Sequence, residues 1–145
     1  MKSLILLFAL LSAIVCQQSN VKLIDASSKK WSSGVQGGGS GIEYYFKIKI
    51  LTQQKIEFDS LWIKNKSLKT YIANKEKSIS NKPISFSKND TIVLRASDLN
   101  SQKNAASSGF PINYNGAALI KYFINGKSFY LQVKNIKEIQ SVNRQ

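Results

Sequence analysis

The side chains that most often carry out catalysis are scarce in this sequence. The chain has 145 residues, no histidine and one cysteine, Cys16. Without histidine there is no Ser-His pair and no imidazole to bind zinc. Cys16 ends an N-terminal apolar segment, so a domain that begins after it has no thiolate for catalysis or for metal binding.

Two Ser-x-x-Lys matches, at residues 27–30 and 85–88, have the spacing found in penicillin-binding enzymes. Those enzymes place the motif on a helix beside SDN and KTG motifs, whereas both matches here lie in turn or strand context without such companions. Paired carboxylates can hydrolyse glycosides. Here, Glu57 and Asp59 share one strand face beside Lys55, which is typical of a solvated surface. We therefore predict that the protein is not an enzyme and has no metal or cofactor site.

A glycine-rich run, GGGSG at residues 37–41, could in principle cradle a phosphate. Nucleotide-binding loops of this kind follow a buried strand and precede a helix, and the P-loop also needs a Lys followed by Ser or Thr. Here an alternating, strand-like segment follows the glycines, and no GK[ST] is present. We interpret the run as a connecting loop, with the preceding Trp31 as an aromatic of the core or its rim.

Residues 1–16, MKSLILLFALLSAIVC, have the organisation of a secretory signal peptide. Lys2 supplies the positive charge, and the apolar run that follows it is interrupted only by Ser12. This run is too short to span a hydrocarbon core of about 30 Å. The sequence therefore predicts an exported protein of the periplasm or cell envelope, without a transmembrane helix.

The end of this segment allows two interpretations that depend on Cys16. As a lipoprotein signal, it would leave Cys16 as the lipidated first residue, although Val15 is larger than the small residue usual before that cysteine. As an ordinary signal, it would be cleaved after Cys16 and leave Gln17 at the terminus. In both cases the remaining domain has no disulfide, so its stability must come from a packed core.

The clearest structural pattern is a hairpin centred on Asn125-Gly126, within residues 118–136. Both residues suit the positive φ angles of a type I′ turn, and alternating apolar runs flank them. A two-residue loop places Ile124 opposite Lys127, Tyr122 opposite Phe129, Ile120 opposite Leu131, and Ala118 opposite Val133. We predict that this face is buried.

The other face of the same hairpin is expected to be partly exposed. It pairs Phe123 with Ser128, Lys121 with Tyr130, and Leu119 with Gln132. Lys121 and Tyr130 would lie side by side, so a cation and an aromatic ring could contact a ligand together. They are our candidate surface contacts.

Further strands are predicted from alternating or β-branched runs at residues 21–25, 42–51, 55–63, 68–73, 84–86 and 91–96. Residues 27–30 and 65–67 are expected to be turns, residues 97–116 a long loop, and residues 141–145 a frayed tail. No segment shows a helical period. The prediction is an all-β chain: a tether at 17–20, then a single antiparallel β-sandwich over 17–145, immunoglobulin-like, with a small barrel as the alternative.

Without Lys2, twenty basic and eight acidic residues give the mature chain a net charge of +12. The lysines are spread along the strands, and this spacing favours solvated faces over a dedicated patch.

Three phrases, FDSLWIKN, DTIVLRASD and PINYNGAALIKYFINGKSFY, resemble small exported proteins and lipoproteins of flavobacteria and related Bacteroidota that have no assigned activity. The resemblance implies an envelope location in a Gram-negative bacterium, and it supports lipidation at Cys16. It carries no catalytic motif.

Two functional hypotheses follow from these observations. We favour a non-catalytic envelope protein that acts by protein–protein contact or as an accessory subunit. The alternative is a binder of anionic glycan, lipid head group or nucleic acid, with Tyr45, Tyr130 or Trp31 as stacking surfaces. An even distribution of lysines in the fold would favour the first hypothesis, and their clustering on one face would favour the second.

Overall fold

The structure is a computed structural model that describes residues 19–73, 84–99 and 110–144. The predicted signal peptide, Cys16 and the first half of the predicted tether lie outside these residues. The described part contains ten strands and no helix: β1 (Val21–Ser33), β2 (Ser40–Ile50), β3 (Lys55–Ile63), β4 (Lys66–Lys69), β5 (Tyr71–Ile72), β6 (Ile84–Ser85), β7 (Thr91–Leu99), β8 (Ala118–Ile124), β9 (Lys127–Val133) and β10 (Lys137–Arg144).

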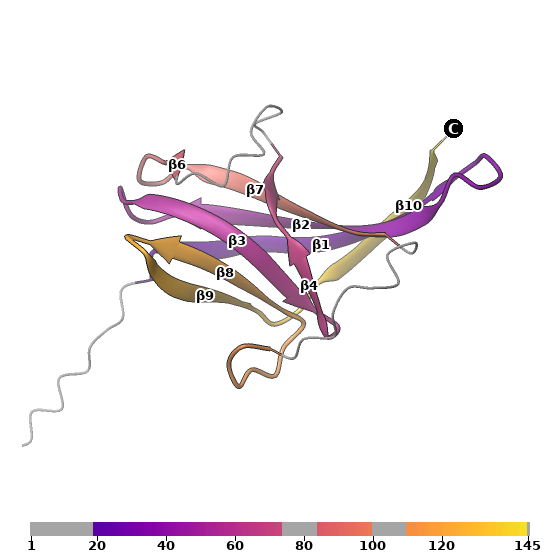
Figure 1. Ribbon diagram of the computed structural model, residues 1–145. Helices are drawn as coiled ribbons and strands as arrows, with labels where there is room; N and C mark the ends of the chain where they lie inside the picture. Colours follow the sequence, from indigo (N-terminus) through magenta and orange to yellow (C-terminus); the bar gives the residue numbers. More distant parts are fainter. Residues whose placement is uncertain (1–18, 74–83, 100–109, 145) are drawn as a thin grey trace, which may run out of the picture.

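The strands form two sheets that pack face to face (Figure 1). Sheet A has the order β10-β1-β2-β7-β5, and sheet B has the order β4-β3-β8-β9, with β6 paired to β3. Without β10 and β6, this is the strand order of immunoglobulin-like sandwiches that carry an extra strand beside the third one. The predicted β-sandwich is therefore confirmed, and the sheets do not close into a barrel.

The core lies between the inner faces of the two sheets. Residues 42–50 alternate as predicted, and the fully buried residues Phe46, Ile48 and Ile50 of β2 face the core. Ile56, Leu61, Ile120 and Val133 close it from sheet B. Because β2 lies in sheet A and β3 in sheet B, the connection between them crosses from one sheet to the other.

The predicted hairpin is confirmed in its turn and its register. Asn125 and Gly126 have φ angles of 51° and 77°, and β8 pairs with β9 in the predicted alignment. One detail of the exposure was wrong. Leu119 was assigned to the partly exposed face but is fully buried, and its register partner on β3 is Trp62.

A bulge in β3 explains why the alternation predicted for residues 55–63 changes phase. The register between β3 and β8 shifts between Phe58 and Ser60. Before the shift, Ile56 faces the core; after it, Leu61 and Ile63 do. A bulge inserts one residue and so reverses the side to which later side chains point.

Three boundaries differ from the predictions because long-range pairing extends the strands. Residues 27–30 were expected to form a turn, but they lie inside β1, which is paired on both sides. The predicted loop at 97–116 begins later, since β7 continues to Leu99. The predicted frayed tail at 141–145 is strand as far as Arg144, where β10 pairs with β1. This pairing is parallel, so the sandwich is not purely antiparallel as predicted.

The predicted strand at 68–73 is divided between the two sheets. β4 pairs with β3 in sheet B, whereas β5 pairs with β7 in sheet A. The turn before β4 is at Lys64 and Asn65, which have φ angles of 46° and 62°, one residue earlier than predicted. β6 lies beside β3, as expected of an edge strand that follows a proline.

Candidate functional site

The outer face of sheet A, meaning the side turned away from sheet B, gathers much of the positive charge of the described residues. Strand alternation and register place on it Lys22, Lys29, Lys47, Lys49, Arg95 and Lys137, against the acidic residues Asp25 and Glu43. The outer face of sheet B carries fewer basic residues, Lys55, Lys69 and Lys121, against Glu57. The acidic Asp59 lies at the β3 bulge. The basic side chains are therefore unevenly divided between the two faces.

Two of the six basic residues on the outer face of sheet A are neutralised by carboxylates. Lys137 Nζ lies 3.3 Å from Asp25 Oδ1, and the Arg95 guanidinium pairs with Glu43. Among the described residues, the other four make no ion pair: Lys22, Lys29, Lys47 and Lys49. Their charges are available to an anion that approaches this face.

A buried carboxylate lies at the centre of this face. Glu43 is 3% exposed, and its side chain accepts hydrogen bonds from the Tyr45 hydroxyl and from Arg95 Nη2. Across the sheet, Tyr45 is the register partner of Arg95, and Arg95 is the partner of Tyr71. The carboxylate therefore holds Tyr45 and Arg95 in place, and Tyr71 beside them is 45% exposed.

The alternation of residues 42–51 predicted that Glu43 would point outward, but it could not predict the contact with Arg95. The two residues are 52 positions apart, and no short turn sets the register between β2 and β7. Trp31 also lies on this face. A Cβ atom at Gly41 would be 3.1 Å from its indole nitrogen, so Trp31 covers Gly41 and is not part of the core.

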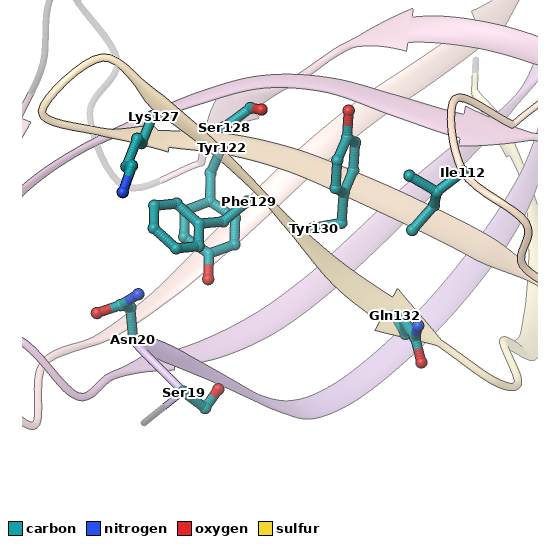
Figure 2. A pocket seen from close by; sticks show the side chains of 9 residues that line it. All are labelled: Ser19, Asn20, Ile112, Tyr122, Lys127, Ser128, Phe129, Tyr130 and Gln132. Carbon is teal, nitrogen blue, oxygen red and sulfur yellow. The ribbon is translucent and has the colours of Figure 1, made fainter. Parts of the chain in front are cut away.

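A second feature is a groove of about 620 Å³ beside β9, shown in Figure 2. It is lined by Ser19, Asn20, Ile112, Tyr122, Lys127, Ser128, Phe129, Tyr130 and Gln132. The described lining contains aromatic rings, hydroxyls, amides and one ammonium group, and it contains no carboxylate. This chemistry suits a polar, uncharged or weakly anionic partner.

The two candidate contacts from the sequence do not form a joint site. Lys121 and Tyr130 are register partners, as predicted. However, Lys121 Nζ lies 4.7 Å from the centre of the Phe123 ring, whereas Tyr130 lines the groove together with Ile112 (Figure 2). The ammonium group is thus engaged by a neighbouring ring on its own strand.

One wall of the groove is formed by two stacked rings. Tyr122 and Phe129 have ring centres 5.6 Å apart at an interplanar angle of 19°. Burial raises the pKa of the Tyr122 phenol, and a hydrogen bond with the Asn20 side chain acts in the opposite direction. Asn20 was predicted to belong to a tether. Its backbone carbonyl accepts a hydrogen bond from Leu51, so it is attached to the domain.

No known protein family, curated protein or solved structure matches this chain. Within the described ranges, no group of three or more Cys, Asp or Glu side chains is arranged to hold a metal ion. The same residues include no helix that is long and apolar enough to cross a membrane.

Proposed function

We propose that the protein is a non-catalytic binder of an anionic polymer and that the outer face of sheet A makes the contact. The observation that carries this proposal is that four lysines on one face, Lys22, Lys29, Lys47 and Lys49, make no ion pair with the carboxylates that the structure describes. The sequence alone favours the hypothesis of protein–protein contact. The clustering of these lysines supports the other hypothesis.

Three of the four lysines, Lys22, Lys47 and Lys49, have a spacing that suits a chain of closely spaced negative charges, whereas Lys29 lies further along β1, opposite Glu43. Lys22 and Lys49 are register partners on adjacent strands, and Lys47 is two residues along from Lys49. Strands lie about 4.8 Å apart, and residues i and i+2 lie about 7 Å apart along a strand. Tyr71 beside Arg95 offers a half-exposed ring on which a base or a sugar could stack.

The test compares two variants with the same net charge. One replaces Lys22, Lys29, Lys47 and Lys49 by Gln; the control replaces Lys55, Lys69, Lys88 and Lys121 by Gln. Affinity for a thymidine oligonucleotide is measured against salt concentration. Each single-strand phosphate contact contributes about 0.7 to the slope of log affinity against log salt. We expect the first variant to lose a slope of about 2 to 3, and the control to lose less than 1.

Equal losses in the two variants would contradict the proposal, because they would mean that net charge alone attracts the oligonucleotide. Wild-type binding that disappears at about 0.15 M salt would contradict it as well, since any strongly basic protein binds polyanions weakly at low salt.

A second candidate function, protein–protein contact, is supported by β9. Among the described strands, β9 pairs with β8 alone. In an antiparallel hairpin with a two-residue turn, alternate residues direct their backbone groups away from the partner strand. Ser128, Tyr130 and Gln132 have this position, and the same residues line the groove. An extended peptide of a partner could add to this edge.

Proline at position 132 tests the second candidate, because it removes one backbone donor from the edge. An envelope protein captured by the wild type should be lost from Gln132→Pro and retained by the variant with the four outer-face lysines replaced. Capture that survives Gln132→Pro in a folded variant would exclude β9 as the contact.

The location of the protein belongs to the same proposal: export to the cell envelope by the signal peptide at residues 1–16. The resemblance to flavobacterial lipoproteins supports lipidation at Cys16. In that case Cys16→Ser should move the protein out of the membrane fraction and abolish labelling by an alkyne fatty acid. A mature wild-type chain that begins at Gln17 in mass spectrometry would instead establish ordinary cleavage.

A further inference from the structure

Three side chains form a row across neighbouring strands on the outer face of sheet A. Arg95 on β7 is the register partner of Tyr71 on β5 and of Tyr45 on β2. Residues that lie opposite each other on adjacent strands have Cβ atoms about 5 Å apart. Tyr71 is 45% exposed, so a planar group that stacks on its ring has an edge within reach of Arg95.

The guanidinium of Arg95 is held in place and keeps donors for a ligand. Its Nη2 donates to the buried carboxylate of Glu43, which also accepts a hydrogen bond from the Tyr45 hydroxyl. A guanidinium has five N–H donors in a planar fork. Among the described residues, Arg95 makes no other hydrogen bond, and its side chain is 42% exposed. The remaining donors can therefore bind a molecule on this face.

The ion pair with Glu43 limits the chemistry of that molecule. Because the carboxylate already balances the charge of the guanidinium, the free donors suit an uncharged acceptor better than a second anion. The edges of nucleobases carry such acceptors. Guanine presents two of them side by side, O6 and N7, and an arginine fork binds this pair with two hydrogen bonds. At the same edge, adenine replaces O6 by an amino group, which is a donor.

A lysine lies at a suitable distance for the phosphate of the same nucleotide. Lys47 is two residues along β2 from Tyr45, so it is diagonal to Arg95 across the two strands. Such diagonal neighbours lie about 7–8 Å apart. Lys47 is exposed and makes no ion pair among the described residues. A base on Tyr71 and Arg95 thus leaves its phosphate near a free ammonium group.

We propose that the polyanion bound by sheet A is a single-stranded nucleic acid, and that Tyr71 and Arg95 bind one guanine base. Tyr71 stacks on the base, and Arg95 donates hydrogen bonds to O6 and N7. This inference rests on the proposed function, because the lysines of the same face make the phosphate contacts. It adds a preference for one base, which charge alone does not give.

The test uses four single strands of about twelve nucleotides, a length within the range of known sites on β-sheet binders. One is all thymidine; in the others thymidine alternates with guanosine, with inosine, or with 7-deazaguanosine. Inosine keeps O6 and N7, whereas 7-deazaguanosine lacks the N7 acceptor. Affinities are measured by fluorescence anisotropy at about 0.15 M salt. We expect the guanosine and inosine strands to bind about 5- to 20-fold more tightly than thymidine, and 7-deazaguanosine to lose most of this preference.

Two variants assign the preference to this site. Arg95→Lys keeps the charge but not the fork, so its preference for guanosine over thymidine should fall to within about twofold. Tyr71→Leu removes the ring and should weaken binding of the guanosine strand about fivefold or more. The control Lys69→Gln, at an exposed position on the outer face of sheet B, should keep the preference of the wild type.

Equal binding of the thymidine and guanosine strands by the wild type would overturn this inference alone, whereas no binding of any strand would overturn the proposed function as well. Full affinity for the 7-deazaguanosine strand, a preference that survives Arg95→Lys, or tighter binding of a sulfated glycan of equal charge would also overturn it. If Arg95→Lys does not fold beside the buried Glu43, Tyr71→Leu decides: an unchanged affinity for the guanosine strand would exclude the site.

Discussion

The outer faces of the two sheets differ in charge and in how the charges are supported. Among the side chains that the structure describes, the outer face of sheet A presents six basic residues and has a buried carboxylate, Glu43, at its centre. Sheet B presents three basic residues, and one of them, Lys121, lies over an aromatic ring. A net charge of +12 read from composition therefore does not describe either surface. Pairing between distant strands decides which face receives the charge.

The largest difference that we expect concerns the carboxylates on the two faces. Glu43→Ala removes the acceptor of both Tyr45 and Arg95 in a buried position. Because the Arg95 side chain is 42% exposed, water can solvate part of its charge. We expect the free energy of unfolding to fall by about 2–3 kcal/mol, measured by chemical denaturation.

The matched control is Glu57→Ala on the outer face of sheet B. Glu57 is partly exposed, is the register partner of Phe123 and makes no ion pair with a described cation. We expect a change within about 0.5 kcal/mol. If the two variants were equally stable, the hydrogen bonds of Glu43 with Tyr45 and Arg95 would not stabilise sheet A. The outer faces of the two sheets would then differ only in their charge.

The two sheets also differ in how far their sequence predicts them. The β8–β9 hairpin was predicted with its register because the turn at Asn125-Gly126 links neighbouring strands directly. Sheet A depends on contacts between residues far apart in the chain. β1 pairs in parallel with β10, which lies more than a hundred residues later in the chain, and no local sequence pattern predicts such a pairing. The prediction of a frayed tail at residues 141–145 was wrong because β10 is held by this long-range pairing.

The second prediction examines the local control of sheet B. Gly126 has a φ angle of 77°, and a Cβ atom there would meet no atom within 4 Å. The cost of Gly126→Val is therefore conformational, about 2 kcal/mol, because a β-branched residue resists positive φ. Gly126→Asn should cost less than half as much in the same thermal unfolding experiment. Equal costs would show that backbone conformation is not the cause.

Two buried tyrosines, one in each sheet, are expected to show smaller effects on stability, and the two effects should have opposite signs. The hydroxyl of Tyr44 in sheet A has no hydrogen-bond partner among the described residues, whereas Tyr122 in sheet B forms a hydrogen bond with the Asn20 side chain. Tyr44→Phe should therefore stabilise the protein by about 1 kcal/mol at pH 7, and Tyr122→Phe should destabilise it by a similar amount. Destabilisation by both variants would mean that the Tyr44 hydroxyl is satisfied.

Tyr44 also predicts how stability depends on pH. The pKa of Tyr44 is raised in the folded state to about 12 from an ordinary value of 10.0. The unfolded chain therefore loses the Tyr44 proton at a lower pH than the folded chain does. The stability that this difference contributes is fully present below pH 10 and is lost as the pH rises to about 12. Between these values the free energy of unfolding should fall more steeply in the wild type than in Tyr44→Phe.

The candidate site was predicted less well than the hairpin. Lys121 and Tyr130 were identified as neighbours, which the register confirms, but Lys121 contacts Phe123 and Tyr130 lines a different groove. Of the four lysines of sheet A, only Lys47 and Lys49 had been predicted to point outward, both from the strand at residues 42–51, whereas Lys29 was assigned to a turn. The common face of the four could not be derived, because it requires the register between β1 and β2 and the bulge of β1 after Leu23.

The smallest effect that we expect comes from single lysines on the two faces. Lys47 is exposed, makes no ion pair among the described residues, and lies two positions from Lys49 on the same strand. The charge of Lys121 is partly engaged by the Phe123 ring. Lys47→Gln should lower the salt dependence of binding to a thymidine oligonucleotide by a slope of about 0.7, one phosphate contact, whereas Lys121→Gln should lower it by less than half of this. Over the range from about 50 to 200 mM salt, a slope of 0.7 corresponds to a two- to threefold change in affinity, which fluorescence anisotropy resolves. If Lys121→Gln had the larger effect, the polyanion would contact sheet B, and the basic face of sheet A would be a solvated surface.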